Sequence, residues 1–190
     1  SFGGPTISFT LQRSLDAVLA QGALVVAADG NGGADALTYS PGALDGVVTV
    51  GAAGRRGERA EYSNYGPRVD LLAPGGNAEA QPDGAPDGIL STYRDDSMGG
   101  DPLAAPYDYE VLAGTSQAAP HVTGGAALVR ALVPKIQQTT FAALLRESAD
   151  ATARCDLSEY GGCGAGLLDL SKLVKLAALQ ASCKCSGDDY

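Results

Sequence analysis

Histidine is almost absent from this chain of 190 residues, which contains one, His121, and no tryptophan. The chain has 13 Lys and Arg against 22 Asp and Glu, which gives a net charge of −9 and no basic patch to displace counterions from phosphates. No apolar run approaches the roughly 20 residues that a membrane span needs, and the first residues lack a signal-peptide pattern. We therefore expect no nucleic-acid partner and no membrane contact.

The four cysteines are gathered near the end of the chain, at Cys155, Cys163, Cys183 and Cys185. Their spacing fits no zinc site with histidine ligands. Cys155 and Cys163 flank a turn-rich loop that a disulfide could close. Cys183 and Cys185 are too close in sequence to pair well, so a bond to another chain or a crossed pairing stays open. This usage predicts an oxidising, extracellular compartment.

Alternating strand and helix patterns predict the fold class. Three short apolar runs are typical of strands buried on both faces, namely 23–28, 47–50 and 69–73. Helical spacing of apolar residues occurs in 11–19 and 139–148, and an apolar helix runs through Leu179. Such alternation, with glycine-rich loops between the elements, predicts one α/β domain over 1–190 with a mainly parallel sheet and a mobile tail at 186–190.

Residues 76–110 differ from the rest, with eight Asp and Glu against one Arg. Only 89–93 resembles a strand, so we expect a solvated surface insertion. Clustered carboxylates also suit calcium, although no EF-hand spacing is present.

The most informative stretch is Gly114–Val122, Gly-Thr-Ser-Gln-Ala-Ala-Pro-His-Val. The simple interpretation is a helix capped by Thr115 or Ser116. The full string, however, closely resembles the nucleophile motif of the subtilisin-like serine peptidases, the subtilases, and the similarity covers nearly the whole chain apart from one insertion. The resemblance implies that Ser116 is the nucleophile at a helix N-terminus, where free amides favour a developing oxyanion.

A catalytic serine needs a base, and the only histidine does not fit that role. His121 follows Ser116 by five residues on the same helix, so at about 100° per residue it points roughly 140° away. The resemblance gives His121 a structural role. It places the catalytic Asp and His in an earlier half of the domain that these residues do not include.

The resemblance also implies the rest of the site. The side chain of Asn31, after an apolar strand, and the backbone amide of Ser116 would donate to the oxyanion. The segment implied to pair with an extended substrate is Ser1, Phe2, Gly3 and Gly4, and the residues implied to line the opposite wall are Ala28, Asp29 and Gly30. Asp29 is a departure, because relatives carry a small apolar residue there. It either favours basic substrate side chains or points outward without effect.

Two further departures and two structural features follow from the same resemblance. Gln117 stands where subtilases usually have methionine, and Ala113 where asparagine is common. The resemblance implies a cation bound by carbonyls of Gly42, Leu44 and Val47. It implies no cofactor for the chemistry, with structural calcium as the metal. Cysteine-bracketed loops like that of Cys155 and Cys163 occur in secreted bacterial subtilases.

Together these observations predict a subtilase-type three-layer α/β fold, of which this chain forms the C-terminal half. The predicted function is a secreted serine endopeptidase acting on polypeptides, with the catalytic Asp and His on a second chain separated by cleavage before Ser1. The chain begins without an initiator methionine, so we expect a processed product or an excised fragment. The alternatives are an inert fragment and a non-catalytic binding module, and the presence of both Asn31 and Ser116 argues against a binding module.

Overall fold

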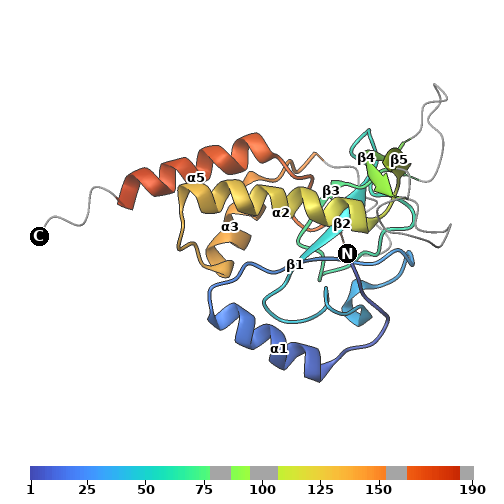
Figure 1. Cartoon of the computed structure of the whole chain (residues 1–190), viewed down its shortest axis with the longest axis horizontal. Coiled ribbons are helices and arrows are strands. Elements are labelled where there is room, and N and C mark those ends of the chain that lie inside the picture. The colour runs from blue at the N-terminus through green and yellow to red at the C-terminus, as the bar shows by residue number, and fades with distance from the viewer. Residues whose placement is uncertain (78–86, 95–106, 153–161, 185–190) are drawn as a thin grey trace, which may run out of the picture.

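A parallel sheet of three strands forms the centre of the computed structural model (Figure 1), which describes residues 1–77, 87–94, 107–152 and 162–184. The strands lie in the order β1 (Val26–Ala28), β2 (Val48–Ala53) and β3 (Leu71–Pro74). All six residues of β2 are buried. The three predicted strands and their parallel arrangement are therefore confirmed, with shifts of a few residues at their ends.

Helices cover both faces of the sheet. The longest helix, α2 (Thr115–Leu132), packs against all three strands, and α3 (Gln138–Ser148) and α5 (Leu170–Lys184) pack with it on the same side (Figure 1). On the other side, α1 (Phe9–Ala20) packs Leu11 and Leu15 against Ala27 and the nearby loop. A short 3₁₀ helix, η1, covers Ala36–Thr38. The three-layer α/β prediction is confirmed.

The acidic insertion contains more regular structure than its sequence indicated. Strands β4 (Ile89–Arg94) and β5 (Tyr107–Leu112) pair as an antiparallel hairpin, with Ile89 opposite Leu112. The prediction of a loop was wrong for 107–110, because pairing with β4 makes a strand of a segment whose side chains stay largely exposed. Other parts of the insertion, 78–86 and 95–106, and the tail 186–190 lie outside the described residues.

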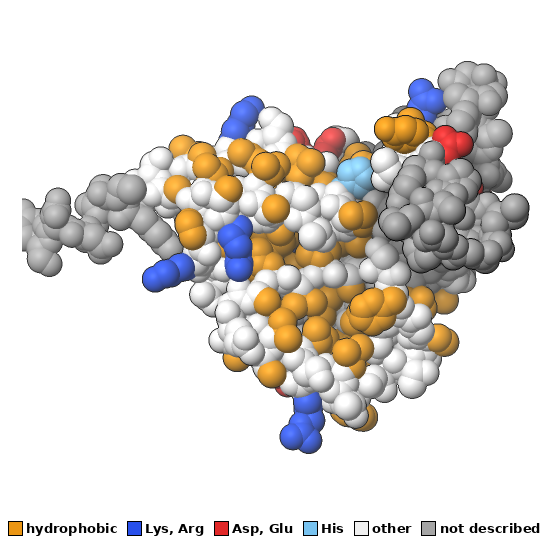
Figure 2. Space-filling view, viewed as in Figure 1, with side chains coloured by type: hydrophobic (Ala, Val, Ile, Leu, Met, Phe, Trp, Pro, Cys, Tyr) orange, Lys and Arg blue, Asp and Glu red, His pale blue; other side chains and the backbone are white. Residues whose placement is uncertain are grey.

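One edge of the sheet is open in the part of the chain that the structure describes. Among these residues, β1 pairs only with β2. Exposed apolar side chains occur on both helices near that edge, including Phe9 and Val18 of α1 and Leu128 and Leu132 of α2. Figure 2, which is seen from the same side as Figure 1, shows hydrophobic side chains gathered on the surface that faces the viewer. None of the described helices is long and apolar enough to cross a membrane.

Candidate active site

Ser116 lies in the first turn of α2, half-buried at the start of the helix. The N-cap residue of α2 is Gly114, and no side chain forms a capping hydrogen bond at this end of the helix. The prediction that Thr115 or Ser116 caps the helix is therefore wrong. The amide of Gly114 donates to the carbonyl of Gly75 at 2.9 Å, which fixes the turn before the helix. The hydroxyl of Ser116 has no hydrogen-bond partner among the described residues.

Thr115 holds the side-chain amide of Asn31 in one orientation. Asn31 Oδ1 accepts hydrogen bonds from Thr115 N at 2.9 Å and from Thr115 Oγ1 at 2.8 Å. The acceptor atom is thereby turned toward the helix start, and Nδ2, with its two hydrogens, is left without an acceptor among the described residues. The sequence suggested Thr115 only as a helix cap, so its contact with Asn31 was not predicted.

Two hydrogen-bond donors border the same space beside Ser116. A Cβ placed on Gly114 would lie 2.7 Å from Gln117 Oε1, 3.6 Å from Asn31 Nδ2 and 3.7 Å from the backbone nitrogen of Ser116. Neither nitrogen donates to another described residue. Donors that are already oriented and have no other acceptor stabilise an oxyanion that forms next to them. The structure brings together the two groups that the sequence singled out, and their catalytic role stays a prediction.

Of the four residues predicted to pair with substrate, Ser1 contacts Ser116 and Gly4 pairs with Ser40. Ser1 Oγ donates to the carbonyl of Ser116 at 2.9 Å. Gly4 and Ser40 exchange two backbone hydrogen bonds of 3.0 Å each. Phe2 is 72% exposed, so its ring is available to a neighbouring molecule. The predicted pairing of these residues with a substrate is untested.

The end of β1 differs from the predicted wall of a substrate pocket. The side chain of Ala28 belongs to the main core, and Gly30 has a φ of 107°, which favours glycine. Asp29 is fully buried, with 0% exposure, and accepts a hydrogen bond of 3.0 Å from Ser63 Oγ. Both predicted alternatives for Asp29, a substrate contact and an outward side chain, are therefore wrong.

Burial also changes the acid–base behaviour of Asp29. Loss of solvation raises the pKa of Asp29 from 3.8 to about 8, although the hydrogen bond from Ser63 and the charge of Arg59 act in the opposite direction. Its Oδ1 has no partner among the described residues. Asp29 is therefore protonated in the folded protein at neutral pH, and it is not a candidate for the carboxylate of a catalytic triad.

A cavity of about 330 Å³ opens next to Ser116, between β4 and α2. Its lining residues are Ile89, Leu90, Ser91, Ser116, Gln117, Pro120 and His121. His121 Nδ1 donates to the carbonyl of Gln117 at 2.8 Å, and no hydrogen bond joins His121 to Ser116. The described residues thus hold no base in contact with the nucleophile, which agrees with the structural role predicted for His121.

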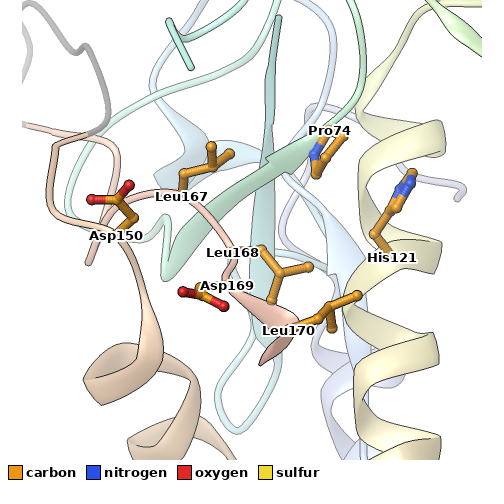
Figure 3. A pocket seen from close by; sticks show the side chains of 7 residues that line it. All are labelled: Pro74, His121, Asp150, Leu167, Leu168, Asp169 and Leu170. Atoms are coloured by element: carbon orange, nitrogen blue, oxygen red, sulfur yellow. The ribbon is translucent and has the colours of Figure 1, made fainter. Parts of the chain in front are cut away.

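A second cavity, of about 320 Å³, lies between β3, α2 and the start of α5 (Figure 3). His121 and Asp150 stand on opposite sides of it (Figure 3). Asp150 accepts hydrogen bonds from Thr152 N at 2.9 Å and Thr152 Oγ1 at 2.7 Å, and these bonds lower the pKa of Asp150. Asp169 caps α5 by accepting from Lys172 N at 2.8 Å. Both carboxylates therefore form hydrogen bonds within their own segments.

The metal site predicted at Gly42, Leu44 and Val47 does not fit this arrangement. Arg68 Nε donates to the carbonyl of Gly42 at 2.9 Å, and Arg68 Nη2 donates to the carbonyl of Leu44. Thr49 Oγ1 also donates to the Gly42 carbonyl, at 2.6 Å. A guanidinium thus occupies the position where a cation would have to bind. Nor does the described part of the chain hold three or more His, Cys, Asp or Glu side chains placed to bind a metal ion.

Cys163 is buried next to Val69 and Leu72 and takes part in a disulfide bond. Cys155 and Cys185 lie outside the described residues, so the pairing of Cys155 with Cys163 and a bond of Cys183 or Cys185 to another chain stay predictions.

Two residues that the sequence did not single out contact predicted site residues from other segments, namely Asn64 and Arg68. Their partners are tens of residues away in sequence. Short polar residues and a lone arginine carry no distinctive spacing, so no sequence signal could have identified them.

Comparison with known proteins agrees with this geometry. The model of the Subtilase family (Peptidase_S8) matches residues 1–166. An extracellular basic protease of Dichelobacter nodosus is 37% identical over 177 residues, which cover 90% of this chain and 26% of that protein. Subtilisin BL of Lederbergia lenta is 37% identical over 130 residues, which cover 68% of this chain and 40% of that protein.

A solved structure of a protease from Pseudoalteromonas arctica has the same fold, with a TM-score of 0.77 and 35% identity. The match covers 93% of this chain and 49% of that one. The chain thus spans about half or less of the length of the relatives it matches. With the matched segment covering most of its residues, the chain belongs to the subtilase family of serine peptidases.

Proposed function

We propose that this chain provides the nucleophile and the oxyanion hole of a serine endopeptidase that cleaves polypeptides. The observation that carries the proposal is the pair of donors without another acceptor, Asn31 Nδ2 and the backbone amide of Ser116, which both lie near Gly114 at the start of the helix that carries Ser116. This arrangement favours negative charge where the carbonyl oxygen of a substrate would lie during attack.

The chemical steps follow from these positions. Ser116 Oγ attacks the carbonyl carbon of the scissile peptide bond while a base takes its proton, and the negative charge moves to the carbonyl oxygen between the two donors. The C–N bond then breaks, the amine leaves with that proton, and an ester to Ser116 remains. Water hydrolyses the ester by the same sequence of steps, which releases the acid product and restores the hydroxyl.

The base and its orienting carboxylate are proposed to come from a part of the enzyme outside these residues. His121 is bonded elsewhere, and the cavity next to Ser116 leaves room for another side chain. The open edge of β1 and the apolar face beside it suit the packing of further strands and helices. In the form that we propose, this part is a second chain held non-covalently or by a cysteine.

A secreted location is part of the proposal. Two observations support it: the relative from Dichelobacter nodosus is named an extracellular protease, and Cys163 is disulfide-bonded. Disulfides persist mainly in oxidising compartments.

The test compares the intact enzyme, including the part that precedes Ser1 in the domain, with the 190-residue chain alone. A fluorophosphonate should label the intact enzyme at Ser116, and Ser116→Ala should abolish both labelling and peptide hydrolysis. Asn31→Ala should lower kcat by about 10²–10³. Ser14→Ala, which removes an exposed hydroxyl on α1, is the control.

The isolated chain should show only the residual rate that an oxyanion hole and substrate binding provide without a base, about 10³–10⁴ over water. Labelling of the intact enzyme at a different serine would refute the assignment of Ser116. Efficient turnover by the isolated chain would refute the proposal that the base lies elsewhere.

A further inference from the structure

One buried side chain, that of Asn64, forms hydrogen bonds to the backbone of the loop that carries Asn31. Asn64 is only 2% exposed, and its side chain makes three hydrogen bonds, all to this loop. Its Oδ1 accepts from the amides of Gly32 at 3.1 Å and Ala34 at 3.0 Å, and its Nδ2 donates to the carbonyl of Asp29 at 2.6 Å. These bonds fall on both sides of Asn31.

The backbone of Asn64 and the shape of the loop add to this contact. Asn64 N donates to the carbonyl of Gly30 at 3.0 Å. A Cβ on Gly30 would lie 2.5 Å from Asn64 Nδ2, so the loop and the Asn64 side chain approach too closely for any larger residue. Residues 30–34 belong to no helix or strand. The position of their backbone therefore depends strongly on bonds to neighbouring segments.

Thr115 and Asn64 hold different parts of the same residue. Thr115 fixes the orientation of the Asn31 amide, and Asn64 fixes the backbone from which that amide projects. We propose that Asn64 is a positioning residue of the oxyanion hole, acting through Asn31 without touching the substrate. This inference rests on the proposed function, because it requires Asn31 to be an oxyanion donor.

Asn64 can fix the loop because its own segment is anchored to the sheet. The neighbouring Ser63 Oγ accepts from Ala52 N of β2 at 2.9 Å and donates to Asp29 Oδ2 at 3.0 Å. Arg59 Nη1 donates to the carbonyl of Ser63 at 2.5 Å, and its guanidinium lies 5.4 Å from the centre of the Tyr65 ring. The segment of Asn64 is therefore bonded directly to β2.

The experiment uses the intact enzyme and the variant Asn64→Ala, which removes three bonds to the loop. We expect kcat to fall by about 10- to 100-fold with KM changed less than about twofold, since a displacement of 1 Å at a catalytic group can cost 10²-fold in rate. The fall must not exceed that of Asn31→Ala. An unchanged kcat in the folded Asn64→Ala enzyme would overturn the proposal.

Gln138 offers a matched control. Its side-chain amide also makes three backbone hydrogen bonds, to Val25 N, Val25 O and Gly46 O at 3.1, 2.9 and 2.8 Å, but none of them involves the loop of Asn31. Gln138→Ala should therefore reduce thermal stability about as much as Asn64→Ala while leaving kcat unchanged. Equal losses of kcat in both variants would assign the effect to general destabilisation and overturn the positioning role.

A double variant separates a role through Asn31 from an independent one. In the Asn31→Ala background, the further change Asn64→Ala should lower kcat by less than about twofold, because residues that act as a unit are not additive. A full additional loss in that background would overturn the proposal. If Asn64→Ala does not fold, Asn64→Asp, which keeps the two bonds to Oδ1, is used in the same cycle.

Hydrogen exchange gives a readout that does not depend on activity. The amides of Gly32 and Ala34 should exchange faster in Asn64→Ala than in the wild type and in Gln138→Ala. If the intact wild-type enzyme has no Ser116-dependent activity, the proposed function fails, and exchange still decides whether Asn64 fixes the loop. Unchanged exchange at both amides would overturn the contact on which the inference depends.

Discussion

The replacement Asp29→Asn should change how the stability of this protein depends on pH. Asp29 has a pKa of about 8 in the folded chain, where burial opposes its ionisation, against 3.8 in the unfolded chain. Between these two values the unfolded state has released a proton that the folded state keeps. Folding is therefore most favoured by this group below about pH 4, and that contribution is lost as the pH rises toward 8.

The magnitude follows from the linkage of one proton to unfolding. One proton corresponds to about 1.4 kcal/mol for each pH unit, so the free energy of unfolding should fall by roughly 4 kcal/mol between pH 5 and pH 8 on account of Asp29 alone. Asparagine has nearly the shape of the protonated carboxyl group and titrates in neither state. The variant should therefore lose this slope and gain stability relative to the wild type as the pH rises.

The assay is urea unfolding of the intact protein at several pH values, with Ser116→Ala in every sample to prevent self-digestion. The quantity of interest is the difference between the Asp29→Asn protein and its parent, because the titration of other groups cancels in that difference. Any constant effect of the new amide, whose NH₂ group replaces a partnerless oxygen, shifts the difference equally at all pH values.

The control is Asp45→Asn, which removes a carboxylate from the protein surface. A difference between the Asp29 variant and its parent that stays constant from about pH 5 to pH 8 would refute the assignment of a protonated, buried Asp29. An equal slope in the Asp45 variant would show that the effect does not come from burial.

Two further predictions concern Arg68, which contacts the predicted cation site, and Gln117, which follows the nucleophile. Arg68→Ala should lower the free energy of unfolding by about 2–3 kcal/mol, because it removes charged hydrogen bonds to the carbonyls of Gly42 and Leu44. Calcium should then raise the melting temperature of the variant more than that of the wild type. The absence of any added calcium effect would show that these carbonyls cannot bind a cation. Gln117→Met should make peptide hydrolysis by the intact enzyme sensitive to peroxide, because methionine sulfoxide would place a polar group beside Ser116. Inactivation of the wild type at the same rate would contradict that prediction.

The sequence alone determined the α/β class and its parallel sheet, and its resemblance to the subtilases gave the two residues that we propose as central to the site. Short apolar runs must be buried on both faces, and a helix with apolar residues on one side must pack against them, so the parallel sheet could be predicted before its neighbours were known. Ser116 and Asn31 were identified through the resemblance of their segments to the subtilase family, because a helix start and a Gly-Asn turn alone indicate no chemistry.

Only the tertiary structure decided what the neighbouring polar residues do. Side chains alternate between the two faces along an extended segment, so the side chains of Ala28 and Asp29 point to opposite faces of the sheet. The sequence does not reveal that the face of Asp29 is buried or that Ser63 donates a hydrogen bond to it there. Arg68 meets the carbonyls of Gly42 and Leu44 only because β2 and β3 run side by side.

The same limit applies to Asn64 and to strand β5. Asn64 reaches the loop of Asn31 across more than 30 positions in sequence, and β5 becomes a strand through its partner β4. Contacts of this kind depend on which segments the fold brings together. A motif therefore identifies the groups that we propose to perform the chemistry, whereas packing between distant segments decides which groups surround them.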